Sequence, residues 1–309
     1  MFDLKERMPP MRFLSWFRRP APPAPVLSQP WRRTVEPITL SDQRHYLSAV
    51  PYLLPKDETE LHRLDFQHHA LCTALGRHWL APVPEATTSM LDVGCGTGAW
   101  VREAALAFPH AQIVGLDVDL SSLSKMPFPP SCRFVEADVL QGLPFPDLSF
   151  EYVHQRLLVA ALPAQRWPAH VQNLARVTRP DGIVELLEVG LTVEQTGPQM
   201  QRFLAWGQQV AADQGFDPRL MEHLGDLLEG AGLRRVERLA VAVPLGSWGG
   251  RAGELLKKNM LAGFLLLRPL YCGCLDLSQG AFDQTYEALS GEWETFQTSY
   301  VFYGAYGVR

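Results

Sequence analysis

The chain has 309 residues, 47% of them hydrophobic, and a formal net charge of -5. A chain of this length and composition can fill one large core, so the sequence predicts a globular protein. The acidic balance argues against a general nucleic-acid binder. The longest apolar run, LAGFLLL at 261–267, is too short to cross a bilayer, and we expect no membrane span.

The first 50 residues have the composition of a disordered or extended arm. They contain the proline-rich stretch RRPAPPAPVLSQP and more basic than acidic groups, a combination that disfavours a packed core. Contact of this arm with RNA, a membrane or a partner is an alternative, but a solvated arm is the simpler interpretation. We therefore place the arm at 1–50 and the globular domain at 51–309.

A helix is predicted from Asp57 onward. Apolar residues recur there at helical spacing, and Asp57 with Glu60 three residues later resembles a capping pair. We expect Pro82 and Pro84 to end this helix.

Short apolar runs then alternate with helical stretches. This rhythm predicts an α/β fold with a parallel sheet covered on both faces. The expected strands are 89–94, 112–117, 132–137, 150–155 and 183–189, and the expected helices are 97–108 and 167–177.

The second half of the chain is richer in helix. Strands are expected at 234–245 and in the C-terminal SYVFYGAYGVR, with helices at 198–214, 218–231, 251–267 and 279–297. We therefore predict a core at 85–190 and helical insertions at about 197–231 and 247–298. The later insertion is expected to lie over the C-terminal edge of the sheet as a lid.

Three glycines at alternate positions, in the stretch GCGTG, follow the first strand of the core. Missing Cβ atoms at Gly94, Gly96 and Gly98 let the backbone approach a ligand and adopt positive φ. A dinucleotide site usually has G-x-G-x-x-G. Asp92, two residues before this loop, would repel a pyrophosphate and attract a cation. S-adenosylmethionine, with its sulfonium and ammonium groups, is the cofactor that this arrangement favours.

Two further acids stand at the ends of the next strands. Asp117 ends the second strand, where a carboxylate can accept both ribose hydroxyls of a nucleoside, and Asp138 ends the third, within reach of an adenine amino group. Either acid could instead cap a turn. Their order after one glycine loop favours a cofactor site, although Asp117 alone does not separate NAD from S-adenosylmethionine.

Five segments resemble class I S-adenosylmethionine-dependent methyltransferases: LDVGCGTGAW, GLDVD, EADVL, DLSFEYVHQRLL and VTRPDGIVELLE. A sixth, YLLPKDETELHRLDFQHH at 52–69, is similar to the corresponding segment of fungal velvet-complex regulators of secondary metabolism and their bacterial relatives. The resemblance covers about residues 52–190. It implies a Rossmann-like sheet of order 3-2-1-4-5-7-6 with the last strand antiparallel. Asp181 departs from the usual PGG and is expected to change only a turn.

The resemblance also implies a set of cofactor contacts. Asp117 would hold the ribose, Asp138 and Val139 would flank the adenine, and the backbone around the glycines would face the methionine part. The residues expected to bind S-adenosyl-L-methionine, and S-adenosyl-L-homocysteine as product, are Asp92, Gly94, Cys95, Gly96, Gly98, Asp117, Val118, Asp138, Val139, His154 and Tyr52.

Candidates for catalysis and acceptor binding are fewer. His154 ends the fourth strand and is the first candidate for a general base, with a hydrogen-bonded wall residue as the alternative. Arg156 could bind an anionic substrate or pair with Glu188. Aromatic and polar residues of the insertions are candidates for the acceptor pocket: Trp206, Asn259 and Phe264.

Other residues support weaker expectations. Tyr52, Asp57, Arg63 and Gln67 could close over the cofactor from the N-terminal segment. The nearby histidines lack a completing acid or cysteine cluster in sequence, so no metal is expected. Trp100, early in the helix after the glycine loop, could touch the methionine end of the cofactor or pack on the sheet.

The predicted function is methyl transfer from S-adenosylmethionine to a small molecule of specialised metabolism. The alternatives are a cofactor-binding regulator that acts through protein partners, a protein or RNA methyltransferase and, least favoured, an NAD-dependent oxidoreductase. Five scattered cysteines, an odd number, and a start unlike a secretory signal favour the cytoplasm. The sequence does not indicate the oligomeric state or the methylated atom.

Overall fold

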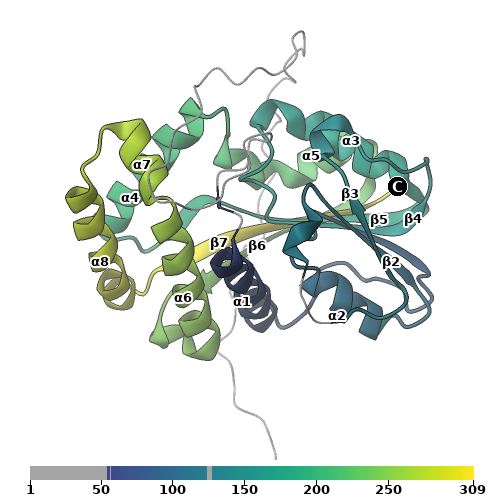
Figure 1. Cartoon of the computed structure of the whole chain (residues 1–309), viewed down its shortest axis with the longest axis horizontal. Helices are drawn as coiled ribbons and strands as arrows, with labels where there is room; N and C mark the ends of the chain where they lie inside the picture. The colour runs from purple at the N-terminus through teal and green to yellow at the C-terminus, as the bar shows by residue number, and fades with distance from the viewer. Residues whose placement is uncertain (1–53, 56, 124–126) are drawn as a thin grey trace, which may run out of the picture.

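The computed structural model describes residues 54–55, 57–123 and 127–309, and in this part of the chain the strands form one seven-stranded sheet (Figure 1). Its order is β3-β2-β1-β4-β5-β7-β6. β1 to β5 pair in parallel, and β7 runs antiparallel to β5 and β6. The predicted topology is therefore confirmed. The strands are β1 (Ser89–Val93), β2 (Gln112–Asp117), β3 (Cys132–Glu136), β4 (Phe150–Arg156), β5 (Thr178–Glu194), β6 (Arg234–Pro244) and β7 (Ser299–Val308).

Helices cover both faces of this sheet (Figure 1). α3 (Trp167–Val177) and α5 (Leu224–Gly230) bury apolar residues against one face. The other face carries the remaining helices: α1 (Glu58–Leu75), α2 (Ala99–Ala107), α4 (Pro198–Asp213), α6 (Gly250–Leu266), α7 (Arg268–Leu275) and α8 (Gln279–Phe296). Short 3-10 turns connect these elements: η1 (Leu120–Ser122), η2 (Val139–Gln141), η3 (Ala164–Arg166), η4 (Pro218–His223) and η5 (Ser247–Gly249).

α1 begins where the capping pair predicts. The Asp57 carboxylate accepts a hydrogen bond from the backbone N–H of Glu60, 3.0 Å away. The helix ends earlier than Pro82 and Pro84 suggested, because Gly76 adopts a left-handed conformation with φ 67° and terminates it after Leu75. The segment after Gly76 is then free to turn back toward the sheet.

Three elements of the second half differ from the predicted ones. β5 extends well beyond 183–189 and contains an irregularity between Val189 and Val193. The helix expected at 218–231 is divided into η4 and α5. α7 was missed because it follows α6 almost without a break and carries Pro269 in its first turn.

The later insertion, α6 to α8, packs against the face formed by β5, β6 and β7. α1 lies beside α6 (Figure 1), and it is α1 that reaches the cofactor cavity described below. The insertion therefore supports α1 from behind and supplies none of the residues that line this cavity. In the described part of the chain, every helix falls short of the length and apolarity that crossing a bilayer requires.

Candidate active site

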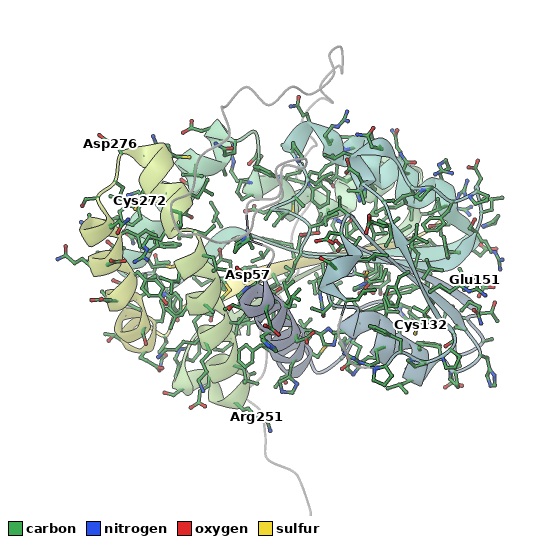
Figure 2. The ribbon with its side chains drawn as sticks, viewed as in Figure 1. Asp57, Cys132, Glu151, Arg251, Cys272 and Asp276 are labelled. Atoms are coloured by element: carbon green, nitrogen blue, oxygen red, sulfur yellow. The ribbon has the colours of Figure 1, made fainter. Side chains whose placement is uncertain are left out.

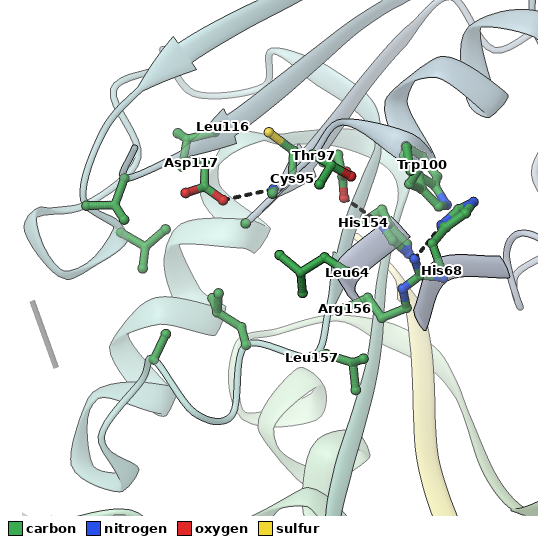
Figure 3. A pocket seen from close by; sticks show the side chains of 18 of the residues that line it. Leu64, His68, Cys95, Thr97, Trp100, Leu116, Asp117, His154, Arg156 and Leu157 are labelled. Carbon is green, nitrogen blue, oxygen red and sulfur yellow. Dashed lines mark hydrogen bonds and ion pairs between the residues drawn. The ribbon is translucent and has the colours of Figure 1, made fainter. Parts of the chain in front are cut away.

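A cavity opens at the carboxyl ends of β1, β2 and β4, with α1 forming its opposite wall (Figure 3). β1 lies between β2 and β4, and the strand order reverses between β1 and β4, which is where open α/β sheets form their ligand crevices. Leu64, Gln67 and His68 of α1 line the cavity together with the glycine loop and the ends of the three strands.

The glycine loop brings its backbone to the cavity wall. Gly94 and Gly96 have φ values of 72° and 52°, in the region that favours glycine. The N–H groups of Gly94 and Cys95 donate to the carbonyl oxygen of Leu116, which fixes the loop on β2. A Cβ at Gly94 would lie 2.7 Å from Cδ1 of Leu158, so this position also lacks space for a side chain.

Asp117 is held at the end of β2 with its carboxylate on the cavity wall. Its side chain is 8% exposed, and its oxygens accept hydrogen bonds from the N–H groups of Gly96, at 2.9 Å, and Asp119, at 3.2 Å. These bonds fix the orientation of the carboxylate, and its role in holding a ribose stays a prediction. A carboxylate at this position suits the ribose of an adenosine group, whether that group belongs to S-adenosylmethionine or to NAD.

The third strand-end acid, Asp138, caps a turn and also lines the cavity. Asp138 lines the cavity with Val118 and Val139, as the cofactor interpretation expects. Its carboxylate also accepts from the N–H of Leu140, 2.9 Å away, and caps η2. Capping and cavity lining are compatible, so Asp138 as an adenine contact stays a prediction.

Asp92 and His154 form a buried pair on the cavity wall. Oδ1 of Asp92 lies 2.7 Å from Nδ1 of His154, and the two residues are 3% and 2% exposed. Trp100 stacks on the imidazole with ring centroids 4.1 Å apart and planes 5° from parallel. A carboxylate at Nδ1 holds the proton there and leaves Nε2 as the basic nitrogen. The sequence offered both residues separately and did not indicate the pair.

Arg156 also lines the cavity but does not pair with Glu188. Its Nη2 lies 2.6 Å from Nδ1 of His68 on α1 (Figure 3). Successive strand residues point to opposite faces of a sheet, and Glu188 lies on the far face, where it contacts Gln155 instead. Burial lowers the pKa of His68, which favours the neutral ring that accepts from Arg156.

Glu188 organises the loop that follows β4, and sequence reasoning missed this role. Its carboxylate accepts from the N–H groups of Leu158 and Val159, each at 3.0 Å, and from Nε2 of Gln155 at 3.0 Å. Burial raises the pKa of Glu188 to about 7. Because Leu158 lines the cavity, this buried carboxyl positions part of the cavity wall.

Of the residues predicted to bind the acceptor, Arg156 lines the cavity, whereas Trp206, Asn259 and Phe264 lie in the helical layer, away from the cavity lining. Asn259 is 2% exposed and accepts from Nη1 of Arg63 at 3.3 Å. Phe264 stacks on Phe203 with centroids 4.3 Å apart, and Trp206 packs in the same aromatic cluster. Amphipathic helices bury their apolar stripe against the sheet, and this packing accounts for their position.

The N-terminal segment reaches the cavity only in part. Gln67 lines it, as expected, whereas Arg63 pairs with Glu60 and Asp57 caps α1. Tyr52 and the arm at 1–50 lie outside the described residues.

Known proteins share both the sequence pattern and the fold. The family model described as a methyltransferase domain matches residues 90–182. The N-methyltransferase sirN of Leptosphaeria maculans is 30% identical over 217 residues, which cover 68% of this chain and 76% of sirN. The secondary metabolism regulator laeA of Coprinopsis cinerea is 35% identical over 144 residues, which cover 44% of this chain but only 35% of laeA.

A solved structure agrees in fold. Phosphoethanolamine N-methyltransferase 2 of Haemonchus contortus, in complex with S-adenosyl-L-methionine, matches with a TM-score of 0.51 and 16% identity over 81% of this chain and 57% of that chain. The sequence relatives, the strand order and the acidic glycine-loop site lead to one assignment: the chain belongs to the class I S-adenosylmethionine-dependent methyltransferases.

Proposed function

We propose that the protein transfers the methyl group of S-adenosylmethionine to an amine nitrogen of a small molecule, with His154 as general base. The observation that carries the proposal is the buried Asp92–His154 pair on the cavity wall. The name of sirN, an N-methyltransferase, supports nitrogen as the acceptor atom.

An acceptor amine that binds in its protonated, ammonium form must lose a proton before the nitrogen has a lone pair that can attack. A bound S-adenosylmethionine would supply an electrophilic methyl group on its sulfonium, and S-adenosylhomocysteine would leave when the methyl group is transferred to the nitrogen. Asp92 holds the His154 ring with Nε2 basic, so that Nε2 can take the ammonium proton. Trp100 keeps the ring in this orientation by stacking on it.

The remaining parts of the site are proposed to hold the cofactor. Asp117 would accept the ribose hydroxyls, Asp138 and Val139 would flank the adenine, and the loop from Gly94 would face the methionine part. Gln67 and Leu64 on α1 would cover this cofactor from the opposite side. Holding two reactants at attack distance supplies about 7 to 11 kcal/mol of the barrier reduction.

The wider role is also a proposal. The relatives include a secondary metabolism regulator and an N-methyltransferase, which favours an acceptor from specialised metabolism. Five scattered cysteines, an odd number, suit a reducing compartment, so we place the reaction in the cytoplasm.

The test uses methyl-labelled S-adenosylmethionine with a panel of small amines, alcohols and thiols. We expect label on nitrogen, and a fall of about 10²- to 10⁴-fold in kcat/KM for His154→Phe, which keeps an aromatic ring against Trp100 but lacks the base. Calorimetry should show cofactor binding by the variant.

Tyr152→Phe is the matched control, because Tyr152 lies on the same face of β4 near Trp100 but outside the cavity lining. Label on oxygen or sulfur, or full activity in His154→Phe, would contradict the proposal. Cofactor binding with no labelled acceptor in the panel would favour a regulatory protein.

A further inference from the structure

We propose a zinc-binding site beside the cofactor cavity, formed by His68, Cys72, His78 and Glu103. Each offers one ligand atom, and these atoms all lie within 4.8 Å of one another. His68 and Cys72 stand one turn apart on α1, His78 follows the end of that helix, and Glu103 comes from α2.

The geometry of the four groups is compact. Oε2 of Glu103 lies 2.6 Å from Nε2 of His68 and 2.5 Å from Nδ1 of His78, and Sγ of Cys72 lies 3.7 Å from Nε2 of His68. Ligands of one tetrahedral zinc are separated by about 3 to 4 Å, given bond lengths of about 2.0 to 2.3 Å. The distances from the Glu103 carboxylate to the two histidine nitrogens therefore need to lengthen slightly when an ion binds.

The set of donors selects the metal. One thiolate, two imidazoles and one carboxylate suit zinc. Calcium and magnesium prefer ligand sets made of oxygen atoms alone, so this set does not suit them. The side chains of His78 and Glu103 are 44% and 37% exposed, so an ion has a path from solvent. The sequence did not indicate this metal site, because Glu103 and His78 join the other two ligands only after folding.

Arg156 would compete with a metal ion for His68, because it contacts the other ring nitrogen of that histidine. In the structure its Nη2 lies 2.6 Å from Nδ1, so Nδ1 accepts and the ring proton is on Nε2 (Figure 3). A metal on Nε2 moves the proton to Nδ1, where it would face the Arg156 donor. Zinc binding thus requires Arg156 to leave His68, and Arg156 lines the cofactor cavity.

Cobalt titration of the metal-free, full-length protein tests the site. We expect one equivalent of Co²⁺ to bind, with thiolate-to-cobalt charge-transfer absorption that Zn²⁺ abolishes by displacement. Cys72→Ser should lose this absorption, and His78→Ala should weaken binding at least tenfold. His69→Ala and Cys132→Ser are the controls, because these residues share the side-chain types but lie outside the cluster.

A further variant tests the competition. Arg156→Leu should bind Co²⁺ more tightly than the natural protein, by severalfold, because no donor then holds the ring proton on Nε2. Circular dichroism of each variant without metal establishes that it folds. Cobalt absorption that persists in Cys72→Ser and His78→Ala, or no binding by the natural protein, would overturn the proposal. If the affinity of Arg156→Leu for Co²⁺ were unchanged, His68 would not be a ligand.

Discussion

Glu188, which holds the loop bordering the cavity, makes the stability of the protein depend on pH. Its pKa is raised from 4.5 to about 7 by burial, so the folded protein holds this carboxyl neutral where the unfolded chain ionises it. The stabilisation is complete below pH 4.5 and is lost as the pH rises to 7. Each pKa unit corresponds to about 1.4 kcal/mol, which gives a loss of about 3 kcal/mol.

The prediction concerns Glu188→Gln, which is neutral at every pH. Between pH 4.5 and pH 8, the free energy of unfolding of the natural protein, measured in urea, should fall by about 3 kcal/mol relative to that of this variant. The natural protein at pH 4.5 is the internal control, because both side chains are then neutral. A difference that stays constant over this range would contradict the burial argument.

Single residues were predictable where their signal is local. The glycine loop and Asp117 follow from short motifs, because missing side chains and a strand-end acid are visible in a few letters. The Asp92–His154 pair joins residues 62 positions apart, and its contact depends on how β1 and β4 align. Gln155 and Glu188 likewise meet only once the pleat of two strands is fixed.

At the scale of elements, α1 is the part that adds an opposite wall to the cavity at the sheet edge. Its residues Leu64, Gln67 and His68 form one wall, and α6 supports it from the other side. Arg63 joins the two helices through Asn259, while its other nitrogens pair with the buried Glu60. The position of α1, and with it the cavity wall, depends on this contact.

Asn259→Ala tests that support. We expect the free energy of unfolding to fall by about 1 kcal/mol, because a buried hydrogen bond is lost, and the affinity for S-adenosylmethionine to fall with it. Chemical denaturation and calorimetry measure the two effects. Gly263→Ala is the control on the same helix: a Cβ there would lie 3.7 Å from Nη1 of Arg63, which is ordinary contact.

The outcome also decides between two roles for Asn259. If stability and cofactor affinity were unchanged while KM for the acceptor rose, Asn259 would be an acceptor-binding residue, as the sequence suggested. The hydrophobic periodicity of this segment predicted the helix α6, but it could not predict that α1 packs against it. Packing of α6 against α1 joins residues 196 positions apart, and no local pattern encodes that distance.

At the scale of the molecule, the order of strands was predictable because the resemblance covers the motifs after each of the first five. Boundaries were predicted closely where turns are short, as at β2 and α3. The insertions carry no comparable motif, so periodicity predicted α4, α6 and α8 but missed α7, and it did not predict how the later insertion packs against β5, β6 and β7. Tertiary packing, rather than propensity, decides where an amphipathic helix lies.

Cofactor binding should be visible as stabilisation of the entire fold, because the cavity unites β1, β2, β4 and α1. At a concentration one hundred times the Kd, a ligand that binds only the folded state adds about 2.7 kcal/mol. For a protein of this size such a gain raises the Tm by about 5 °C. S-adenosylmethionine and S-adenosylhomocysteine should both give this shift, and NAD should give none.

Asp117→Asn should reduce that shift by more than half at the same ligand concentration. The substitution removes a charged acceptor, and the loss of hydrogen bonds from ribose hydroxyls to a charged group would cost about 1.5 to 3 kcal/mol. Asp119→Asn is the matched control, because Asp119 caps η1 nearby without lining the cavity. Equal shifts in both variants would place the ribose elsewhere, whereas a shift produced by NAD would mean that this glycine loop accepts a pyrophosphate despite the acid beside it.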